Sequence, residues 1–216
     1  MARSDSKQKQ RILDAAILVF ADHGLNGATT RMLARQAGMN SALIYYYFEN
    51  KQSLFAEAIQ TVLQRFFNSL QSHPKTFPCG RDRLAFLVNS IFDYAAAHPE
   101  FIRLVVIAFN LHPELFGKAI TALILHQLPY PLKILKEGIE QRQLRPMHPI
   151  KGWWHIVGVC LFNLKLRDIL AHVTPTPAFV SFPDPAAQRQ AIIETLAQGM
   201  VRLPERNKAH SRSTHA

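Results

Sequence analysis

Residues 29–55 read TTRMLARQAGMNSALIYYYFENKQSLF, and this stretch decides how the beginning of the chain folds. Thr29 or Thr30 offers an N-cap hydroxyl to a helix that stops at Gly38. A second helix follows after a short turn, with Asn40 as its predicted cap. A helix, a glycine-containing turn and a second helix at this close spacing predict a helix-turn-helix.

Two further helices are predicted to flank this stretch. Residues 11–22 place apolar side chains three and four positions apart, and Gly24 follows where a left-handed C-terminal cap belongs. The first helix should therefore end near His23. Asn50 is predicted to cap a longer helix whose apolar residues run from position 54 to 66.

The rest of the chain is also predicted to be helical. Residues 72–82 concentrate proline and glycine and are expected to separate the leading unit from the later helices. Helical apolar spacing then recurs over 83–97, 99–110, 113–142, 149–172 and 185–202. Pro129 and Pro131 should kink or split the longest of these segments. Because no alternating apolar and polar run is bounded by hairpin turns, the sequence predicts an all-α protein.

Composition narrows the class of protein. The 216 residues are 48% hydrophobic, enough for a substantial core, and the formal net charge of +10 fits a polyanionic partner, either nucleic acid or an anionic membrane surface. The first ten residues are polar, and the most apolar stretch, 152–164, is shorter than the roughly 20 residues of a membrane-spanning helix. We therefore expect a soluble cytoplasmic protein.

Nothing in the sequence points to a metal, a cofactor or catalysis. The two cysteines, Cys79 and Cys160, lie in different contexts, and the ten histidines lack the His-x-x-x-His spacing of zinc sites. A glycine-rich phosphate loop, a G-x-S-x-G elbow and an H-E-x-x-H motif are also missing. We predict no metal site, no cofactor, no catalytic residues and no enzymatic activity.

The aromatic run has two faces if residues 41–48 are helical. Neighbours on a helix lie three or four positions apart, so Ile44 and Phe48 share the side that packs on the first helix. The outward side then holds Ser41, Ala42 and Tyr45, with Tyr46 and Tyr47 on the flanks. A recognition helix uses such outward residues on base edges and phosphates, although tyrosines can also simply cover a small core.

Residues 29–55 resemble the TetR family of transcriptional regulators. The shared features are a threonine-initiated helix, an Ala-Gly turn, a tyrosine followed three positions later by phenylalanine, and then lysine and leucine. The resemblance implies a helix-turn-helix, three-helix DNA-binding domain with a basic N-terminal arm in residues 1–50. It also implies a larger helical-bundle domain for effector binding and dimerisation in residues 51–205. The block of charges that follows predicts a disordered basic tail, 206–216.

The resemblance also implies roles for individual residues. Thr30 and Tyr45 resemble phosphate contacts of the family, and Lys51 resembles its phosphate-anchoring lysine. Arg31 can read a guanine because a guanidinium matches O6 and N7, unless it is only a solvated charge. Tyr47 stands where the family often has histidine. The predicted DNA-binding residues are Thr30, Arg31, Asn40, Ser41, Ala42, Leu43, Tyr45, Tyr46, Tyr47 and Lys51. Cations that could add phosphate contacts are Arg3, Lys7, Lys9 and Arg11 in the arm and Arg202, Arg206, Lys208 and Arg212 in the tail.

Segment 149–172 is apolar around nearly its whole circumference, so it must be covered on all sides. One side can meet the chain's own core, and the other is predicted to meet a second chain, together with the last helix, unless the helix is simply well buried. The resemblance also implies such a four-helix interface. The predicted interface residues are Trp153, Val157, Leu161, Leu164, Ile192, Leu196 and Met200.

The middle helices are rich in aromatic residues, which more often form core than a pocket. The resemblance implies a pocket for a small hydrophobic or aromatic effector, and the predicted ligand-binding residues are Phe92, Phe109, Asn110 and Trp154. The sequence thus predicts a homodimeric, ligand-responsive repressor that binds a palindromic double-stranded DNA operator, with no membrane partner. The alternatives are an activator or ligand-independent regulator of the same fold, a helical enzyme, and a basic membrane-surface adaptor.

Overall fold

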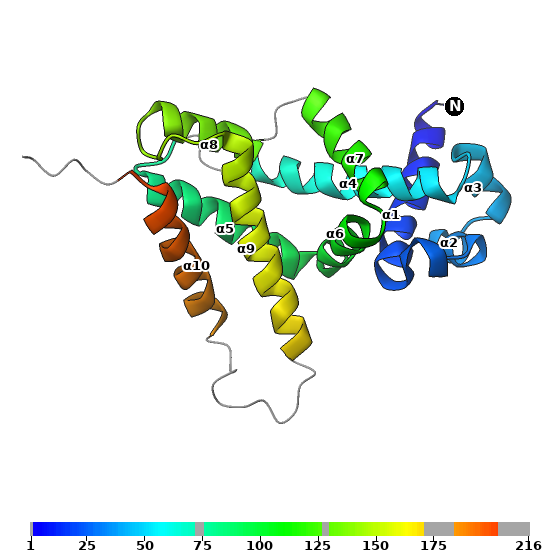
Figure 1. Ribbon diagram of the computed structural model, residues 1–216. Helices are drawn as coiled ribbons and strands as arrows, with labels where there is room; N and C mark the ends of the chain where they lie inside the picture. The colour runs from blue at the N-terminus through cyan, green and yellow to red at the C-terminus, as the bar shows by residue number, and fades with distance from the viewer. Residues whose placement is uncertain (1, 72–75, 127–129, 171–183, 203–216) are drawn as a thin grey trace, which may run out of the picture.

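The computed structural model describes residues 2–71, 76–126, 130–170 and 184–202, and most of this part of the chain is helical (Figure 1). In chain order the helices are α1 (Ala2–Gly27), α2 (Thr30–Ala37), α3 (Ser41–Tyr47), α4 (Lys51–Leu70), α5 (Gly80–Ala97), α6 (Pro99–Leu111), α7 (Pro113–His126), α8 (Tyr130–Glu140), α9 (Pro149–Leu170) and α10 (Pro185–Met200). The described residues hold no strand, and their one isolated bridge pairs Leu144 with Val201. The predicted all-α fold is confirmed.

The two short helices begin at their predicted caps. Thr29 Oγ1 accepts a hydrogen bond from the N–H of Met32 (3.2 Å) at the start of α2. Gly38 ends α2 at φ 63° and ψ 39°, the left-handed conformation that glycine adopts without steric cost. Asn40 Oδ1 accepts from the N–H of Ala42 (3.0 Å) at the start of α3. Because one residue, Met39, separates Gly38 from the next cap, the two helices are held by a tight turn.

The helices that flank α2 and α3 differ in how closely their bounds match the prediction. Asn50 and Ser53 form a capping box at the start of α4, with the N–H of Ser53 donating to Asn50 Oδ1 at 2.8 Å, so the predicted cap is confirmed. α1 is longer than the predicted segment 11–22 at both ends. It begins at Ala2, and a further helical turn follows Gly24, whose φ of 65° and ψ of 177° interrupt the helix.

Prolines divide the remaining helices. Four helices have proline as their first residue, namely Pro99, Pro113, Pro149 and Pro185. The missing N–H costs little there, because the first N–H groups of a helix have no partner within it. The predicted segment 113–142 is split into α7 and α8, and Pro131 lies in the first turn of α8, whereas Pro129 is outside the described residues.

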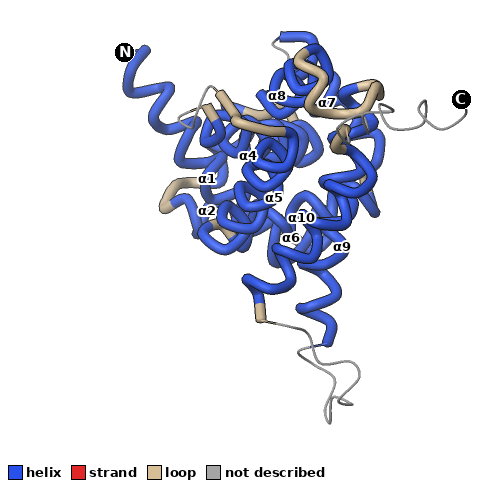
Figure 2. Tube along the Cα trace, turned by 90° about the vertical axis from the view of Figure 1, so that its left-hand side faces the viewer, coloured by secondary structure: helices blue, strands red, loops and turns tan. Residues whose placement is uncertain are grey.

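α4 joins the two ends of the molecule (Figure 1). It packs against α1 at one end and against α6, α7 and α8 along its length. α9 and α10 contact each other and lie at the end away from α2 and α3 (Figure 1). In the turned view they lie on the side opposite to α1 and α2 (Figure 2). Among the helices described, none combines the length and apolarity that crossing a membrane requires.

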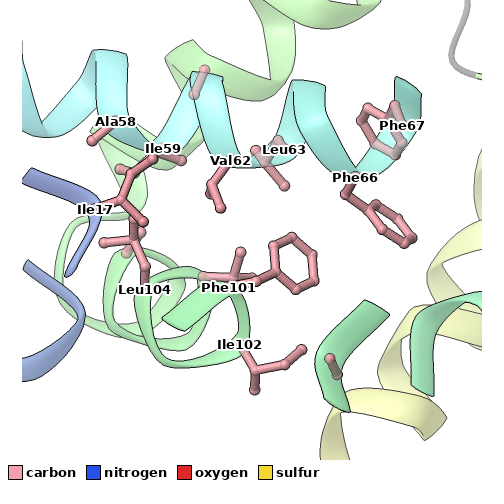
Figure 3. Packing of buried hydrophobic residues seen from close by; sticks show 14 of the residues in the cluster. Ile17, Ala58, Ile59, Val62, Leu63, Phe66, Phe67, Phe101, Ile102 and Leu104 are labelled. Atoms are coloured by element: carbon pink, nitrogen blue, oxygen red, sulfur yellow. The ribbon is translucent and has the colours of Figure 1, made fainter. Parts of the chain in front are cut away.

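The buried core follows α4 from one end to the other. Val62 and Phe66 of α4 point toward α6 (Figure 3), where the rings of Phe66 and Phe101 lie 5.2 Å apart between centroids. The same buried cluster takes in residues of α1 and of α10. Because this cluster is continuous, the division of the chain at residue 50 stays a prediction, and the predicted tail, 206–216, lies outside the described residues.

Arg83 carries a buried charge near the start of α5, with 1% of its surface exposed. Its Nε donates to Gln143 Oε1 at 2.5 Å, and its Nη1 donates to the carbonyl oxygen of Ile134 at 3.1 Å. The carboxylate oxygen Oε2 of Glu137 lies 3.7 Å from Arg83 Nη1. A buried charge is tolerated only when it is bonded in this way, so Arg83 ties α5 to α8 and to the turn before α9.

Candidate nucleic-acid interface

α3 presents an aromatic face to solvent. Ile44 and Phe48 are 4% and 3% exposed and belong to the core shared with α1. Tyr45 and Tyr46, on the other side of the helix, are 60% and 73% exposed. The predicted orientation of α3 is therefore confirmed, with the aliphatic and benzyl side chains inside and two phenols outside.

The hydroxyls of Thr30 and Tyr45 meet between α2 and α3. Thr30 Oγ1 and Tyr45 Oη lie 3.0 Å apart, the distance of a hydrogen bond in which either hydroxyl can be the donor. Thr30 is the first residue of α2, and Tyr45 lies one turn into α3. Two residues predicted separately as phosphate contacts therefore form one hydroxyl pair at the surface.

The other predicted residues on this side of α2 and α3 are at least partly accessible. Exposed residues are Arg31, Asn40 and Ala42, and half-buried ones are Ser41 and Leu43. The side-chain oxygen of Asn40 is occupied by its capping bond, so its amide nitrogen is the group that can donate elsewhere. The first turn of α3 thus offers polar and small apolar groups to a partner.

Lys51 links α4 to the loop before α2. Its Nζ donates to the carbonyl oxygen of Ala28 at 2.8 Å, and the side chain is half-buried. An ammonium group has three N–H donors, so this bond leaves two that can meet an anion. The lysine that the resemblance marks for phosphate contact therefore also holds the helix-turn-helix to α4.

Tyr47 faces α1 instead of the outer surface. Its hydroxyl donates to the carboxylate of Asp5 and lies 2.9 Å from Gln8 Oε1. The hydrogen bond to Asp5 is the main reason that the pKa of Tyr47 rises to about 12, with partial desolvation as the next cause. This placement argues against the predicted DNA contact by the Tyr47 hydroxyl, because its proton is already donated within the protein.

The predicted N-terminal arm is part of α1, and two of its cations have partners in the fold. Lys9 Nζ lies 2.7 Å from the carboxylate of Glu57 in α4. Arg11 Nη2 donates to the carbonyl oxygen of Ala37, the last residue of α2, at 3.1 Å. Lys7 is exposed. Four of the predicted cationic side chains lie outside the described part, namely Arg3, Arg206, Lys208 and Arg212.

The four residues predicted to bind an effector do not form one enclosed pocket. Phe92 is buried on α5, with the Arg189 guanidinium 5.2 Å from its ring centroid. Phe109 and Asn110 are exposed near the end of α6, and Trp154 is 63% exposed on α9. Aromatic spacing alone did not distinguish core positions from surface positions. Within the described ranges, no three potential metal ligands come together.

The predicted interface residues fall into two groups. Ile192, Leu196 and Met200 of α10 are buried in the chain's own core, so their side chains stabilise the protomer. The residues of α9 in the set are half-buried against that core, namely Trp153, Val157, Leu161 and Leu164. The large apolar side chains that α9 exposes most are Trp154, Phe162 and Ile169, at 63%, 65% and 58%.

Two family models match this arrangement. The model of bacterial regulatory proteins of the tetR family matches residues 12–58, which contain α2, α3 and the start of α4. The model of the tetracyclin repressor-like C-terminal domain matches residues 81–196, more than half of the 216-residue chain. The chain belongs to the TetR family. This TetR-family chain is thus a member of a family of regulatory proteins and not of enzymes.

Relatives of this TetR-family chain agree with that assignment. The HTH-type transcriptional repressor SCO4008 of Streptomyces coelicolor is 36% identical over 103 residues, 48% of this chain and 50% of that protein. The HTH-type transcriptional repressor NicS of Pseudomonas putida is 29% identical over 117 residues, 54% of this chain and 55% of that protein. The matches therefore span about half the length of these relatives.

A solved structure extends the likeness to nearly the whole chain. The transcriptional regulator FadR from Bacillus subtilis, solved in complex with stearoyl-CoA, superposes with a TM-score of 0.67. The match covers 88% of this chain and 98% of that one at 18% identity. At this identity the comparison shows a shared fold.

The sequence did not reveal the partners of Tyr47. Asp5 and Gln8 lie about 40 residues earlier in the chain, in a segment that the composition marks only as polar. Their spacing of three positions places both on one face of a helix, but nothing in the local pattern shows that this face meets α3. The extension of α1 to Ala2 is what brings them there.

Proposed function

We propose that this TetR-family chain is a transcriptional repressor that binds double-stranded DNA through α3 and the start of α2. The observation that carries the proposal is the hydroxyl pair of Thr30 and Tyr45 on an exposed face. Outward hydroxyls at the start of a helix-turn-helix are groups that donate to phosphate oxygens. The formal net charge of +10 favours the same polyanionic partner.

The residues of this face divide into phosphate contacts and base contacts. The Tyr45 hydroxyl donates to a phosphate oxygen while it accepts a hydrogen bond from the Thr30 hydroxyl. Accepting that bond polarises the Tyr45 O–H group and strengthens its bond to the phosphate. The two N–H groups of Lys51 that are not bonded to the Ala28 carbonyl add a charged contact to the backbone. Arg31, exposed on α2, reads a guanine edge.

The start of α3 completes base reading. The Ser41 hydroxyl can donate or accept, and Ala42 and Leu43 offer apolar contact to a thymine methyl group. Recognition helices use these first residues because the N-terminal end of the helix enters the major groove.

A homodimer is the second part of the proposal. Trp154, Phe162 and Ile169 form an exposed apolar ridge on α9. A hollow beside it, between α9 and α10, is lined by residues that include Gly158 and Gly199. An ideal Cβ at either glycine would have no neighbouring atom within 4 Å, so there is room for a partner helix to approach.

Two copies joined through α9 and α10 carry two recognition helices. Helix-turn-helix dimers read half-sites about 34–36 Å apart, one turn of DNA. The proposed operator is therefore an inverted repeat. Phe162→Glu places a charge on the ridge and is expected to shift the protein from dimer to monomer in analytical ultracentrifugation. An unchanged sedimentation coefficient would contradict this interface.

The proposed regulation is release from DNA by a small hydrophobic or aromatic effector bound among the central helices. α1 is tied to α4 by the ion pair between Lys9 and Glu57 and to α6 by one between Asp22 and Arg103 at 2.9 Å. Each ion pair is partly exposed and contributes at most about 1 kcal/mol. The packed faces of α4 therefore carry most of the proposed coupling between the central helices and the DNA-binding helices. A ligand that prefers a conformation with a displaced α4 would reorient the DNA-binding head, which consists of α1, α2 and α3, and would lower the affinity for the operator.

Selection from a random duplex library tests the function. The wild-type protein should enrich an inverted repeat whose half-site centres are about 10 base pairs apart. Arg31→Ala should still bind but accept more bases at one position of each half-site, with a loss of discrimination of about 1–3 kcal/mol. A library that shows no enrichment after repeated rounds at low salt would contradict the proposed function.

A further inference from the structure

The first three turns of α1 contact every element of the helix-turn-helix. Asp5 and Gln8 bond to Tyr47 near the end of α3. Lys9 lies over the Phe48 ring, 5.3 Å from its centroid. Arg11 caps the end of α2. The segment predicted to be a basic N-terminal arm is thus attached to the helix-turn-helix.

The bond between Asp5 and Tyr47 differs from the other contacts in its chemistry. A phenol has one proton, so the Tyr47 hydroxyl cannot donate to Asp5 and to a DNA phosphate at the same time. The ring is half-buried and makes an edge contact with Tyr46, with centroids 4.9 Å apart. Both contacts hold the side chain toward α1 and away from the face that carries Tyr45.

We propose that Tyr47 is a positioning residue, which fixes the direction of the recognition helix by bonding α3 to Asp5 of α1, and that its hydroxyl does not contact DNA. The inference rests on the proposed DNA binding by α3. α3 has seven residues, and Ile44 is its buried side chain, so a contact at its C-terminal end limits how far the helix can tilt. The first turns of α1 are then part of the DNA-reading head.

Asp5 gives this proposal an unusual electrostatic consequence. Removal of a carboxylate near a bound polyanion normally strengthens binding, because a repulsion is lost. Here Asp5→Ala should weaken DNA binding, because the Tyr47 hydroxyl loses its charged acceptor, keeps only the neutral Gln8 Oε1, and holds α3 less firmly. Asp5→Asn removes the same charge but keeps a side-chain oxygen that can accept the bond.

The test measures the affinity of full-length variants for the duplex that the wild-type protein selects from a random library. Asp5→Ala and Tyr47→Phe are each expected to weaken binding about 10- to 100-fold, the square of the range for one lost hydrogen bond, because both protomers of the dimer lose the contact. Asp5→Asn should bind at least about threefold more tightly than Asp5→Ala. In the Asp5→Ala background, Tyr47→Phe should cause a smaller loss than in the wild type, because only the contact with Gln8 Oε1 remains to be broken.

Two results would overturn the proposal. Asp5→Ala could bind the duplex more tightly than wild type, which would leave only the charge effect. Tyr47→Phe could also weaken binding equally with and without Asp5, as a direct phosphate contact would.

A second measurement needs no DNA and separates this proposal from the proposed function. Amide hydrogen exchange of residues 45–48 in the free protein should accelerate about 3- to 10-fold in Asp5→Ala and Tyr47→Phe, and less in Asp5→Asn. Unchanged exchange in all three variants would show that the bond does not hold α3. Accelerated exchange in the variants of a protein that selects no duplex would support the contact between Tyr47 and Asp5 and would refute the proposed DNA binding.

Discussion

Tyr45→Phe removes one hydroxyl from the exposed face of α3 and leaves the ring in place. The hydroxyl is bonded to Thr30 in the free protein, at 3.0 Å, so the variant loses both that bond and the proposed bond to phosphate. A net contribution of about 1 kcal/mol for the bond to phosphate gives about 2 kcal/mol for the two heads of a dimer. This corresponds to an approximately 30-fold weaker complex.

Fluorescence anisotropy with the selected duplex measures this loss at several salt concentrations. The hydroxyl is neutral, so Tyr45→Phe should weaken binding at every salt concentration without changing the slope against log salt. Lys51→Ala should in contrast lower the slope by about 1 per head. Tyr94→Phe, on α5, is the matched control and should bind like wild type. An affinity of Tyr45→Phe within about twofold of wild type would refute the reasoning, because one hydrogen bond is worth more than that.

Two further predictions concern stability and thiol chemistry. An ideal Cβ at Gly80 would lie 2.5 Å from the carbonyl oxygen of Gln143, so Gly80→Ala should destabilise the fold by about 1–3 kcal/mol and lower Tm by about 3–10 °C. Gly117→Ala should instead stabilise α7 by about 0.5–1 kcal/mol, because no atom lies within 4 Å of the new Cβ. Equal Tm shifts of the two variants in thermal denaturation would contradict both predictions. Burial raises the pKa of the Cys160 thiol to about 12, so at pH 8 only about one part in 10⁴ is thiolate. A disulfide reagent should therefore modify the exposed Cys79 at once and Cys160 only after unfolding, and two equally fast thiols would contradict this burial.

Local chemistry made the helix-turn-helix predictable. Thr29, Gly38, Asn40 and Asn50 act within three or four residues of the groups that they cap, so their effect is visible in the sequence. The direction of α3 follows from helical periodicity in the same way. Residues 44 and 48 share a face, and the exposed position of Tyr45 follows from that.

Contacts between distant segments were not predictable in this way. Tyr47 and Asp5 are joined across 42 positions, and only the packing of α1 against the head brings them together. Ile192 of α10 was predicted on an interface because amphipathic spacing does not say which apolar face meets the chain's own core. The predicted effector residues illustrate the same limit and stay a prediction. Phe92 is buried and Phe109 is exposed, although both lie on helices rich in aromatic residues.

Hydrogen exchange with and without the selected duplex tests whether α3 meets DNA. Binding should slow amide exchange in α2, α3 and the first turn of α4, residues 30–54, and leave the outer faces of α9 and α10 unchanged. Protection that spares residues 30–54 while the duplex is bound would contradict DNA recognition by α3.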